Sequence, residues 1–592
     1  MRSRDDKTEL SVTAGQAKAT DPKSVEESGP ADAPVVSLSR RGFLSRATVS
    51  TAVAAAAVSV PSLLSKRAKA SQESDSPDIA RVTQEAEVAS EGAPPPSRRL
   101  RAFRIRIQAA EAEVRVPVPR QKSNGDEDRY PSRIGNFSKG LPHDDIGEVD
   151  PAAYDALLTA IASEDPDDFE RIPIGGTVKL ANPQAGLAFD LEGTDSGQLA
   201  LPPAPALASA ERAGEMVEDY WMALAREIPF SQYGQEPITA AAIDELNALS
   251  DFRGPKVNGQ VTPGTLFRGR TAGDLIGPYI SQFLLLPVNF GGLHIDQKYG
   301  IYPAGVDYLT DFVAWRNCQN GVAVPSVPFS GTGYVRNGRD LGSYDHVDFP
   351  AQANVTAAFW LLQNGAPTNP GNPYRRSTNQ NGSITFGNQH ILSLLSEVWI
   401  AGLKAAFHQK WFVHRTLRPE AYGGLVHNTL SRGAMYPLHE DVLNAHVLNE
   451  IVSRYGTYLL PHGDPEGCPQ HPAYPAAHAV TAGASVTVLK AFFDESFVIR
   501  NPVVPSDDGQ SLIPYAGEDV DQITVGGELN KVANNIALGR DIEGVHWRSD
   551  GWQGLLLGEA VAISVMRDQH HLFNERFNGL TFTKFDGTTI TV

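Results

Sequence analysis

Apolar residues recur every three or four positions along much of this chain, which is the spacing of one face of an α-helix. The clearest run is 391–410, which begins with Ile391, Leu394 and Val398. It ends before Pro419, because a proline disfavours helical geometry at the residue that precedes it. The pattern predicts a long buried helix here. Similar runs predict further helices at 206–225, 272–286, 476–493, 529–538 and 552–566.

The segments between the predicted helices are long and contain many turn-forming residues. The segment 366–388 is crowded with Asn, Gly, Pro and Ser, and we expect a loop there. The segment 98–119 alternates enough to allow one or two strands. The sequence therefore predicts a mostly helical protein with long loops and a few minor strands.

The N-terminal segment has the pattern of an export signal. Arg40 and Arg41 directly precede the apolar stretch 52–64, and 68–70 has the small-residue form of a cleavage site. The apolar stretch holds only about a dozen residues, too few to cross a bilayer roughly 30 Å thick, so a permanent membrane anchor is the weaker interpretation. We expect twin-arginine export to the periplasm or the extracellular space. The predicted segments are a signal at 1–70, an acidic disordered linker at 71–97 and one folded domain at 98–592.

Composition and charge narrow the classes of function. The chain has 592 residues, of which 41% are hydrophobic and 20% are charged, as in folded globular proteins. A net charge of -18 argues against general nucleic-acid binding, which requires a basic surface. Cys318 and Cys468 lack metal-ligand spacing, and they are either one disulfide or two free thiols, since the sequence gives no distance between them.

Positive charge gathers near the end of the longest predicted helix. Lys410 lies in its last turns, and Arg418 directly precedes Pro419. Arg418 should therefore leave the helix axis and turn back toward Lys410. Basic residues are also common at helix C-termini, where they complement the helix dipole, so this pair alone has an ordinary structural explanation.

A second segment, 475–478, places a histidine at a predicted helix start. Pro475 suits the first helical position, and the unpaired amides that follow it attract an anion. His478 then lies in the first turn, beside that anion. An ordinary capping or packing role is the alternative for this histidine.

A third segment, 540–551, places Arg540 at the end of one helix and His546 in the short connection to the next. We expect Ser549 to cap that next helix. Asp550, four residues after His546, is either a partner that fixes the histidine tautomer or a helix cap. Three cations, a helix N-terminus and two histidines together suit an oxyanion such as phosphate or vanadate, whose oxygens require charged or amide donors.

These motifs resemble those of the vanadium-dependent haloperoxidases, whose superfamily also contains type-2 phosphatidic acid phosphatases and bacterial acid phosphatases. The resemblance covers most of 98–592 and implies an all-α fold with two four-helix-bundle-like cores. It also implies a homo-oligomer, as a dimer or larger. The eight-residue spacing between Lys410 and Arg418 is similar to the spacing in the algal bromoperoxidase branch. The motifs are Lys410-x7-Arg418-Pro419, Pro475-Ala476-Ala477-His478 and Arg540-x5-His546-x3-Asp550, and further similar stretches are 269–274, 277–283 and 307–312.

The resemblance implies vanadate as the cofactor and assigns a role to each candidate residue. His546 is the axial ligand of vanadium, and His478 is the acid-base group. Lys410, Arg418 and Arg540 neutralise the vanadate oxygens, and Lys410 also polarises bound hydrogen peroxide. The implied reaction oxidises bromide or iodide with hydrogen peroxide to hypohalous acid, which halogenates an organic substrate.

Three positions carry finer expectations. His471 stands where the algal enzymes have a histidine and the fungal chloroperoxidase has a phenylalanine, which favours bromide and iodide over chloride; packing at the pocket rim is the alternative. Ala476 and Ala477 replace the Ser-Gly that is usual in the family. A lost hydrogen bond to a charged group costs about 1.5 to 3 kcal/mol, so we expect roughly ten- to hundredfold weaker vanadate binding. The Ala477 amide is kept, but its methyl is strained if the site requires positive φ.

Two other functions are compatible with these motifs. One is a phosphatase that uses His546 as nucleophile and His478 as general acid, because vanadate mimics the geometry of phosphoryl transfer. The length of the chain and its bromoperoxidase-like stretches argue against it. The other is a non-catalytic exported protein that binds anions or forms assemblies, with turnover lost through Ala476 and Ala477.

Overall fold

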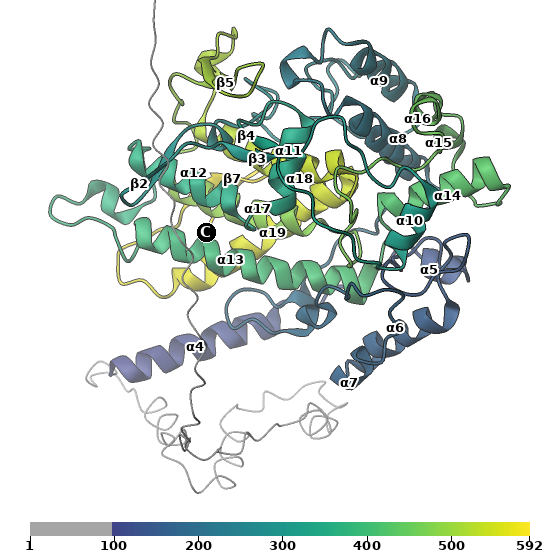
Figure 1. The fold of residues 1–592 in the computed structure, drawn as a ribbon. Coiled ribbons are helices and arrows are strands. Elements are labelled where there is room, and N and C mark those ends of the chain that lie inside the picture. Colours follow the sequence, from purple (N-terminus) through teal and green to yellow (C-terminus); the bar gives the residue numbers. More distant parts are fainter. Residues whose placement is uncertain (1–96) are drawn as a thin grey trace, which may run out of the picture. The chain divides into compact units, whose positions relative to one another are not determined.

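A computed structural model describes residues 97–592, and Arg101–Val592 forms one compact unit. The predicted signal and nearly all of the predicted linker lie outside the described residues. The unit consists of helices joined by long loops, and its described strands form two-stranded antiparallel hairpins (Figure 1). The predicted all-α fold class is confirmed.

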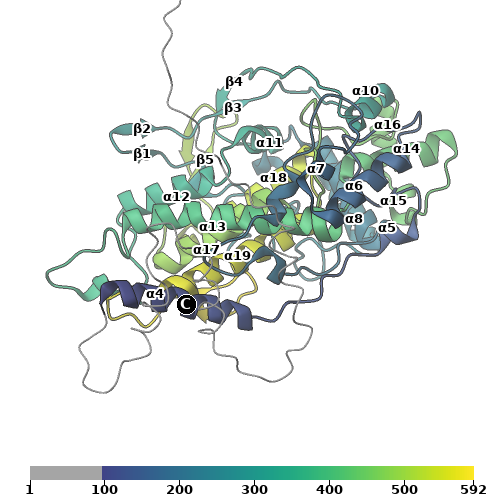
Figure 2. The same ribbon diagram turned by 90° about the horizontal axis from the view of Figure 1, so that it is seen from below.

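The larger group of helices surrounds α17 (Ala477–Phe492), in which all but one residue is buried. The helices α13 (Asn388–His408), α18 (Val525–Glu543) and α19 (Arg548–His570) pack against α17, and α12 (Gln352–Gln363) packs beside α13 (Figures 1 and 2). Gly483, Gly554 and Gly558 permit the close approach of α17 and α19, because a Cβ at any of them would collide with the other helix. The N-terminus of α17, where we expected the oxyanion pocket, is therefore held between neighbouring helices.

A second group of helices surrounds α8 (Ala210–Ala225). The helices α9 (Pro237–Ala248), α14 (Pro419–Arg432), α15 (Glu440–Leu443) and α16 (Val447–Tyr455) pack against α8. Because α8 also contacts α18, the two groups share one continuous hydrophobic core.

The remaining elements are short or peripheral. The other helices are α4 (Arg98–Arg115), α5 (Asp126–Arg129), α6 (Pro151–Ser163), α7 (Pro166–Phe169), α10 (Phe312–Gln319) and α11 (Gly338–Val347). The hairpins pair β1 (Val288–Phe290) with β2 (Leu293–Ile295), β3 (Tyr299–Ile301) with β4 (Gly331–Gly333), β5 (Val503–Pro505) with β6 (Leu512–Pro514), and β7 (Thr581–Thr583) with β8 (Thr589–Thr591).

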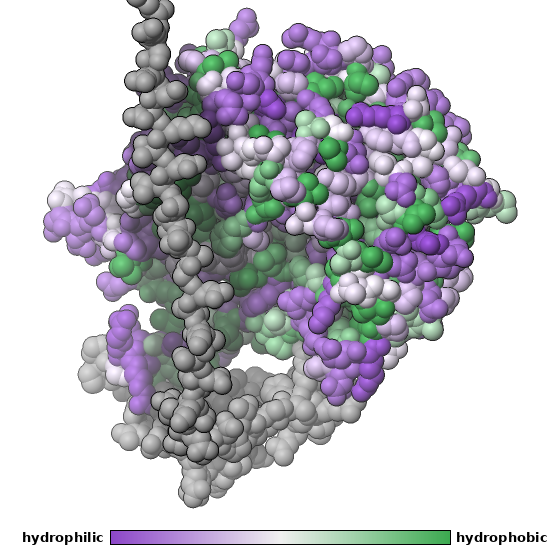
Figure 3. All heavy atoms as spheres, in the orientation of Figure 1, coloured by the Kyte–Doolittle hydropathy of each residue, from purple (hydrophilic) through white to green (hydrophobic). Residues whose placement is uncertain are grey.

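The helix α13 is half-buried, whereas the sequence predicted a buried helix. Leu394 and Val398 face the core, but Ile400 is 47% exposed. On the face drawn in Figure 3, hydrophobic residues gather near the centre, around α13. The described residues include one helical segment, Asn388–His414, that is long and apolar enough to cross a membrane by length and composition. Its packing against α17 and α19 accounts for that apolar character, since one face belongs to the core.

Two predictions of secondary structure are wrong. The segment 98–119 forms α4 and no strand; it is rich in Arg, Ala and Glu, which are strong helix formers. The segment 272–286 forms turns that end in the short 3-10 helix Gln282–Leu284. Gly273 and Gly277 adopt φ of 87° and 73°, which interrupt a right-handed helix.

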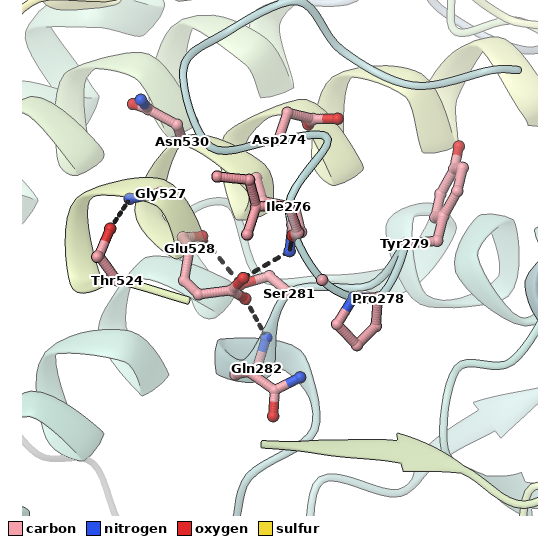
Figure 4. A network of polar contacts seen from close by, with 12 residues as sticks. Asp274, Ile276, Pro278, Tyr279, Ser281, Gln282, Thr524, Gly527, Glu528 and Asn530 are labelled. Carbon is pink, nitrogen blue, oxygen red and sulfur yellow. Dashed lines mark hydrogen bonds and ion pairs between the residues drawn. The ribbon is translucent and has the colours of Figure 1, made fainter. Parts of the chain in front are cut away.

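Side-chain hydrogen bonds anchor this turn segment to α18 (Figure 4). The Gln282 amide donates to the Glu528 carboxylate at 2.6 Å, and the Ser281 hydroxyl donates to the Glu528 carbonyl at 2.9 Å. Lys531 pairs with the same carboxylate at 2.5 Å and donates to the Ile276 carbonyl. Polar groups of the segment 276–282 thus form hydrogen bonds with α18, in place of the bonds they would make within a helix.

Both cysteines of the described chain are free and buried, beside an ion pair. Lys139 Nζ lies 3.0 Å from Glu420 Oε2, and the Cys468 amide donates to the same oxygen at 2.6 Å. Lys139 Nζ and Cys318 Sγ both donate to the Glu466 carbonyl, at 2.7 and 3.0 Å. Burial raises the pKa of the Cys318 thiol to about 12, and burial also raises the pKa of Cys468. Thiols in such surroundings are unreactive.

We predict that Glu420→Ala lowers the free energy of unfolding by about 3 to 5 kcal/mol, because it leaves the Lys139 ammonium buried without a counter-charge. Urea unfolding followed by circular dichroism measures the change. The control is Asp145→Ala, which removes the fully exposed partner of Arg316 and leaves the urea midpoint unchanged. Equal midpoints for the two variants would contradict the prediction.

Candidate active site

The helix α17 begins at the centre of the candidate site. Ala476 is its N-cap, with φ of -67° and ψ of 120°, and Ala477 is its first helical residue. Pro475 therefore precedes the cap, and its predicted place in the first helical position is wrong. His478 lies in the first turn, as expected. Among the described residues no side chain caps α17, so its first amides remain available to an anion.

Lys410 enters the site from a π-helical turn, Gln409–His414, that continues α13. Its Nζ donates to the carbonyls of Pro472 and Ala473, each at 2.7 Å. Burial, and next the charge of Arg418, hold the pKa of Lys410 well below its usual value. A neighbouring anion raises that pKa, so Lys410 is suited to pair with one.

Arg418 joins His546 to His471, the predicted halide residue. It is the N-cap of α14, with an extended backbone (φ -90°, ψ 158°). Its Nη1 donates to the Val545 carbonyl at 2.7 Å and to His546 Nε2 at 2.9 Å, and its Nη2 donates to His471 Nδ1 at 2.9 Å. Burial lowers the pKa of Arg418 to about 10, so it stays charged at neutral pH.

These contacts fix the tautomers of both histidines. A guanidinium has no acceptor, so His546 Nε2 accepts from Arg418. His471 Nδ1 also lies 3.2 Å from the Pro472 carbonyl, but the shorter, charge-assisted bond from Arg418 makes this nitrogen an acceptor too. The ring proton of His546 is therefore on Nδ1, where it is donated to Asp550 Oδ2 at 2.8 Å. Burial, followed by the nearby cations, lowers the pKa of both histidines well below the usual value. Both rings are neutral at pH 7. The lone pair of His546 Nε2 accepts from Arg418 in this structure, and it is available to a metal only when that hydrogen bond is released.

Asp550 performs both roles that its spacing allowed. Besides His546 Nδ1, its Oδ2 accepts the amide of Trp547, the N-cap of α19, at 3.3 Å. Burial raises the pKa of Asp550 to about 7. Ser549 was expected to cap this helix, and that prediction is wrong: it lies inside the first turn, and its amide donates to Glu215 at 2.7 Å.

His478 is held by a carboxylate that the sequence did not reveal. Its Nε2 lies 3.0 Å from Oδ1 of Asp348, the C-cap of α11. A carboxylate accepts this bond, so the proton is on Nε2 and Nδ1 is the basic nitrogen of the neutral ring. The His478 side chain is 25% exposed, whereas His546 is 2% exposed, so of these two histidines His478 is the one that solvent reaches. The pair is separated by 130 residues, and no local pattern links its members.

Arg540 completes the set of cations from the last turn of α18. Its Nη1 donates to the Asp345 carbonyl at 3.0 Å and forms an ion pair with Glu543 at 2.6 Å. Its Nε is buried and has no hydrogen-bond partner within the described part of the chain. Arg540 is recognisable in the sequence as a site residue, but neither of its partners is.

The donor set fits a tetrahedral oxyanion such as vanadate. Three buried cations and the first amides of α17 supply donors, and Arg540 Nε is an unused one. His546 Nε2 supplies one neutral ligand atom. Ala477 has ordinary helical geometry, so the strain considered for its methyl is absent. The hydroxyl that Ala476 lacks remains a missing donor.

A second group of potential ligands lies behind this site. Atoms of Glu420, His462 and Cys468 lie within 4.8 Å of one another, and all three residues are buried. The Lys139 ammonium already neutralises Glu420 at 3.0 Å, and it repels a divalent cation at this position. We therefore interpret this group as a structural ion-pair cluster.

Comparison with known proteins identifies the family. A model described as the VCPO second helical-bundle domain matches residues 448–575. The vanadium-dependent bromoperoxidase of Corallina pilulifera is 34% identical over 593 residues, which cover 84% of this chain and 98% of that protein. The chain belongs to the vanadium-dependent bromoperoxidase family. The corresponding enzyme of Ascophyllum nodosum is 35% identical over 532 residues, which cover 85% of this chain and 94% of the relative.

A solved structure supports the same assignment. It is described as the homohexameric structure of the second vanadate-dependent bromoperoxidase (AnII) from Ascophyllum nodosum, and it matches with a TM-score of 0.80 at 32% identity. The match covers 86% of this chain and 95% of that one. The protein is thus a vanadate-dependent haloperoxidase that oxidises halide with hydrogen peroxide, and vanadate is its cofactor.

We predict that Ala476→Ser lowers the dissociation constant of vanadate roughly ten- to hundredfold, because it restores one hydroxyl donor to a charged ligand. Isothermal titration of the protein with orthovanadate measures the constant. The matched control places the same hydroxyl at Ala479, one turn further along α17, where affinity is expected to stay unchanged. An equal constant for Ala476→Ser and the parent would mean that another donor already serves this oxygen.

We predict that Asp550→Ala weakens vanadate binding about 10- to 100-fold, because His546 Nδ1 loses the acceptor that fixes its tautomer. Asp550→Asn keeps an accepting oxygen and should recover part of the affinity. Titration with vanadate gives both constants, and thermal unfolding shows whether the variants remain folded. Unchanged affinity in a folded Asp550→Ala protein would refute this role.

Proposed function

We propose that this enzyme oxidises bromide and iodide in preference to chloride and releases hypohalous acid that halogenates organic molecules. The observation that carries the proposal is the Arg418 guanidinium between His546 Nε2 and His471 Nδ1, with 2.9 Å to each. One guanidinium thereby holds both His471, the predicted halide residue, and His546, the predicted metal ligand. The similarity of His471 to the algal branch supports the choice of halide.

The residues that hold vanadate follow from this geometry. His546 Nε2 is the metal ligand, because Asp550 keeps the ring proton on Nδ1. Lys410, Arg418 and Arg540 neutralise the oxygens, and the Ala477 amide donates one further hydrogen bond. When bound, vanadate supplies a Lewis acid that activates hydrogen peroxide without a change of metal oxidation state.

His478 transfers the protons of the reaction. Its neutral Nδ1 takes a proton from hydrogen peroxide, and Asp348 stabilises the resulting imidazolium through the bond at Nε2. The same proton is returned as water forms. Lys410 also polarises the bound peroxide with its positive charge. This role is additional to its neutralisation of the vanadate oxygens.

His471 contributes to the halide site. Because its Nδ1 accepts from Arg418, its Nε2 carries a proton that can be donated to a halide. Burial lowers the pKa of His471, so the ring is a neutral donor, which suits a large, weakly hydrated anion better than a small one.

Export and assembly complete the proposal. The twin-arginine pattern at 39–44 supports transport to the periplasm or the extracellular space. The related bromoperoxidase AnII of Ascophyllum nodosum is a homohexamer, which supports a homo-oligomer here too. Hydrogen peroxide, a halide and a small organic molecule are the expected partners, with no nucleic acid and no permanent membrane anchor.

We predict that the vanadate-free mature protein brominates a phenol-type dye only after vanadate is added in metal-free, phosphate-free buffer. His546→Ala should lower this activity at least about hundredfold, because the metal loses its protein ligand. His571→Ala, an exposed histidine just after α19, is the matched control and should retain full activity. The rates with bromide, iodide and chloride test the halide preference. Hydrolysis of a phosphate ester without bromination would indicate the phosphatase. No activity in either assay would indicate a non-catalytic protein.

A further inference from the structure

A cavity of about 100 Å³ lies between the second half of α18, the start of α19 and the start of α8. A cavity needs roughly 10 to 15 Å³ to hold one water, so this one accommodates several waters or one small organic molecule. None of the described residues that line it belongs to the vanadate site. Arg540 contributes to that site, whereas the next residue of α18, Asp541, points about 100° further round the helix and lines the cavity.

The inner wall of the cavity carries a carboxylate without a partner. Asp541 is 1% exposed, and neither of its side-chain oxygens has a hydrogen-bond partner in the described part of the chain. Ser549 lines the same cavity, and its hydroxyl is also buried without such a partner among the described residues. Three oxygen atoms that accept hydrogen bonds are therefore left without a donor. Each such atom costs free energy until a donor reaches it.

Negative charge dominates around Asp541. Burial raises the pKa of Asp541 well above its usual value, and the charges of Glu218, Asp550 and Glu215 raise it further. The charge of Arg548 opposes this shift, but its guanidinium is bound on two sides by the Glu218 carboxylate. The partner that Asp541 lacks is thus a positively charged donor of hydrogen bonds.

The mouth of the cavity has the opposite charge. Arg270 is exposed there, and its guanidinium stacks on the Trp552 ring, 3.8 Å from the centroid. Among the described residues Arg270 forms no ion pair, whereas the neighbouring Arg253 is paired with Glu211 at 2.8 Å. Partial burial, and next the charges of Arg548 and Arg253, lower the pKa of Arg270. An anionic group at the mouth would offset this repulsion.

We propose that this cavity binds a small amino acid as its zwitterion, with the ammonium group at Asp541 and the carboxylate at Arg270. An ammonium has three N–H donors, which match the two oxygens of Asp541 and the hydroxyl of Ser549. A guanidinium holds a carboxylate through two parallel hydrogen bonds. Binding at this cavity requires neither vanadate nor halide, so it is independent of the haloperoxidase reaction.

Isothermal titration of the whole protein with a panel of small compounds tests the proposal. Glycine, β-alanine and γ-aminobutyrate carry both charges, separated by successively longer carbon chains. Ethylammonium and propionate each carry only one of the two charges. We expect at least one of the amino acids to bind one-to-one and roughly tenfold or more tightly than either singly charged compound, because it alone meets both ends of the cavity.

Asp541→Asn tests the ammonium end of the site. It keeps the shape of the side chain but removes its charge, so we expect it to weaken binding of the best amino acid roughly ten- to hundredfold. The matched control is Asp340→Asn, which neutralises another buried aspartate, paired with Arg336 outside this cavity. The control should leave the affinity unchanged, and thermal unfolding shows whether both variants are folded.

Arg270→Ala tests the carboxylate end at an exposed position, where the fold is not at risk. We expect it to weaken binding roughly two- to fivefold, as for the loss of a partly exposed ion pair. The matched control is Arg432→Ala. Arg432 is also exposed and stacks on an aromatic ring, that of Phe312, at 3.5 Å from the centroid. The affinity of this control should equal that of the parent protein.

Three outcomes overturn the proposal. Ethylammonium bound as tightly as the best amino acid, with no loss of affinity in Arg270→Ala, would show a site for a cation alone. Binding of calcium chloride that depends on Asp541, without binding of any amino acid, would show a metal site. No binding of any of these compounds would show that the cavity holds only water.

Discussion

The arrangement of the site depends on one buried guanidinium. Arg418 donates to the ring of His471, the ring of His546 and the carbonyl of Val545, and so joins segments that lie 53 and 128 residues further along the chain. Because arginine keeps its charge when buried and has no acceptor, it imposes the acceptor role on both histidines. Lysine has no planar fork with which to do the same. The position of the ring proton, on Nδ1 of His546 and on Nε2 of His471, follows from this interaction.

Carboxylates surround the site but do not fill it. Asp550 is bound to His546, Asp348 to His478 and Glu543 to Arg540. Of the three site cations only Arg540 pairs with one of these acids, and its Nε has no hydrogen-bond partner among the described residues. Burial makes the mutual repulsion of the cations costly. An oxyanion is the partner that offsets this repulsion. The backbone at Ala477 is not strained, because this residue has ordinary helical geometry.

Sequence periodicity predicted α13, α17, α18 and α19, because apolar residues recur in each at helical spacing, although α17 and α18 are buried nearly all round. It failed at 272–286, where the apolar residues have helical spacing but glycines with positive φ break the backbone. It also missed α4, whose charged residues are strong helix formers without a clear apolar face. Such errors arise where backbone conformation or intrinsic propensity outweighs the hydrophobic pattern.

Residue types and short spacings by themselves determined Lys410, Arg418, His478, Arg540 and His546 as the candidate site, because oxyanion chemistry requires these donors and helix ends are local features. Only the tertiary structure decided which partners they have. The pairing of Asp348 with His478, the tautomers set by Arg418 and the thiol state of the cysteines depend on distances between segments remote in sequence. Those distances are set when the helices pack, and local sequence patterns do not encode them.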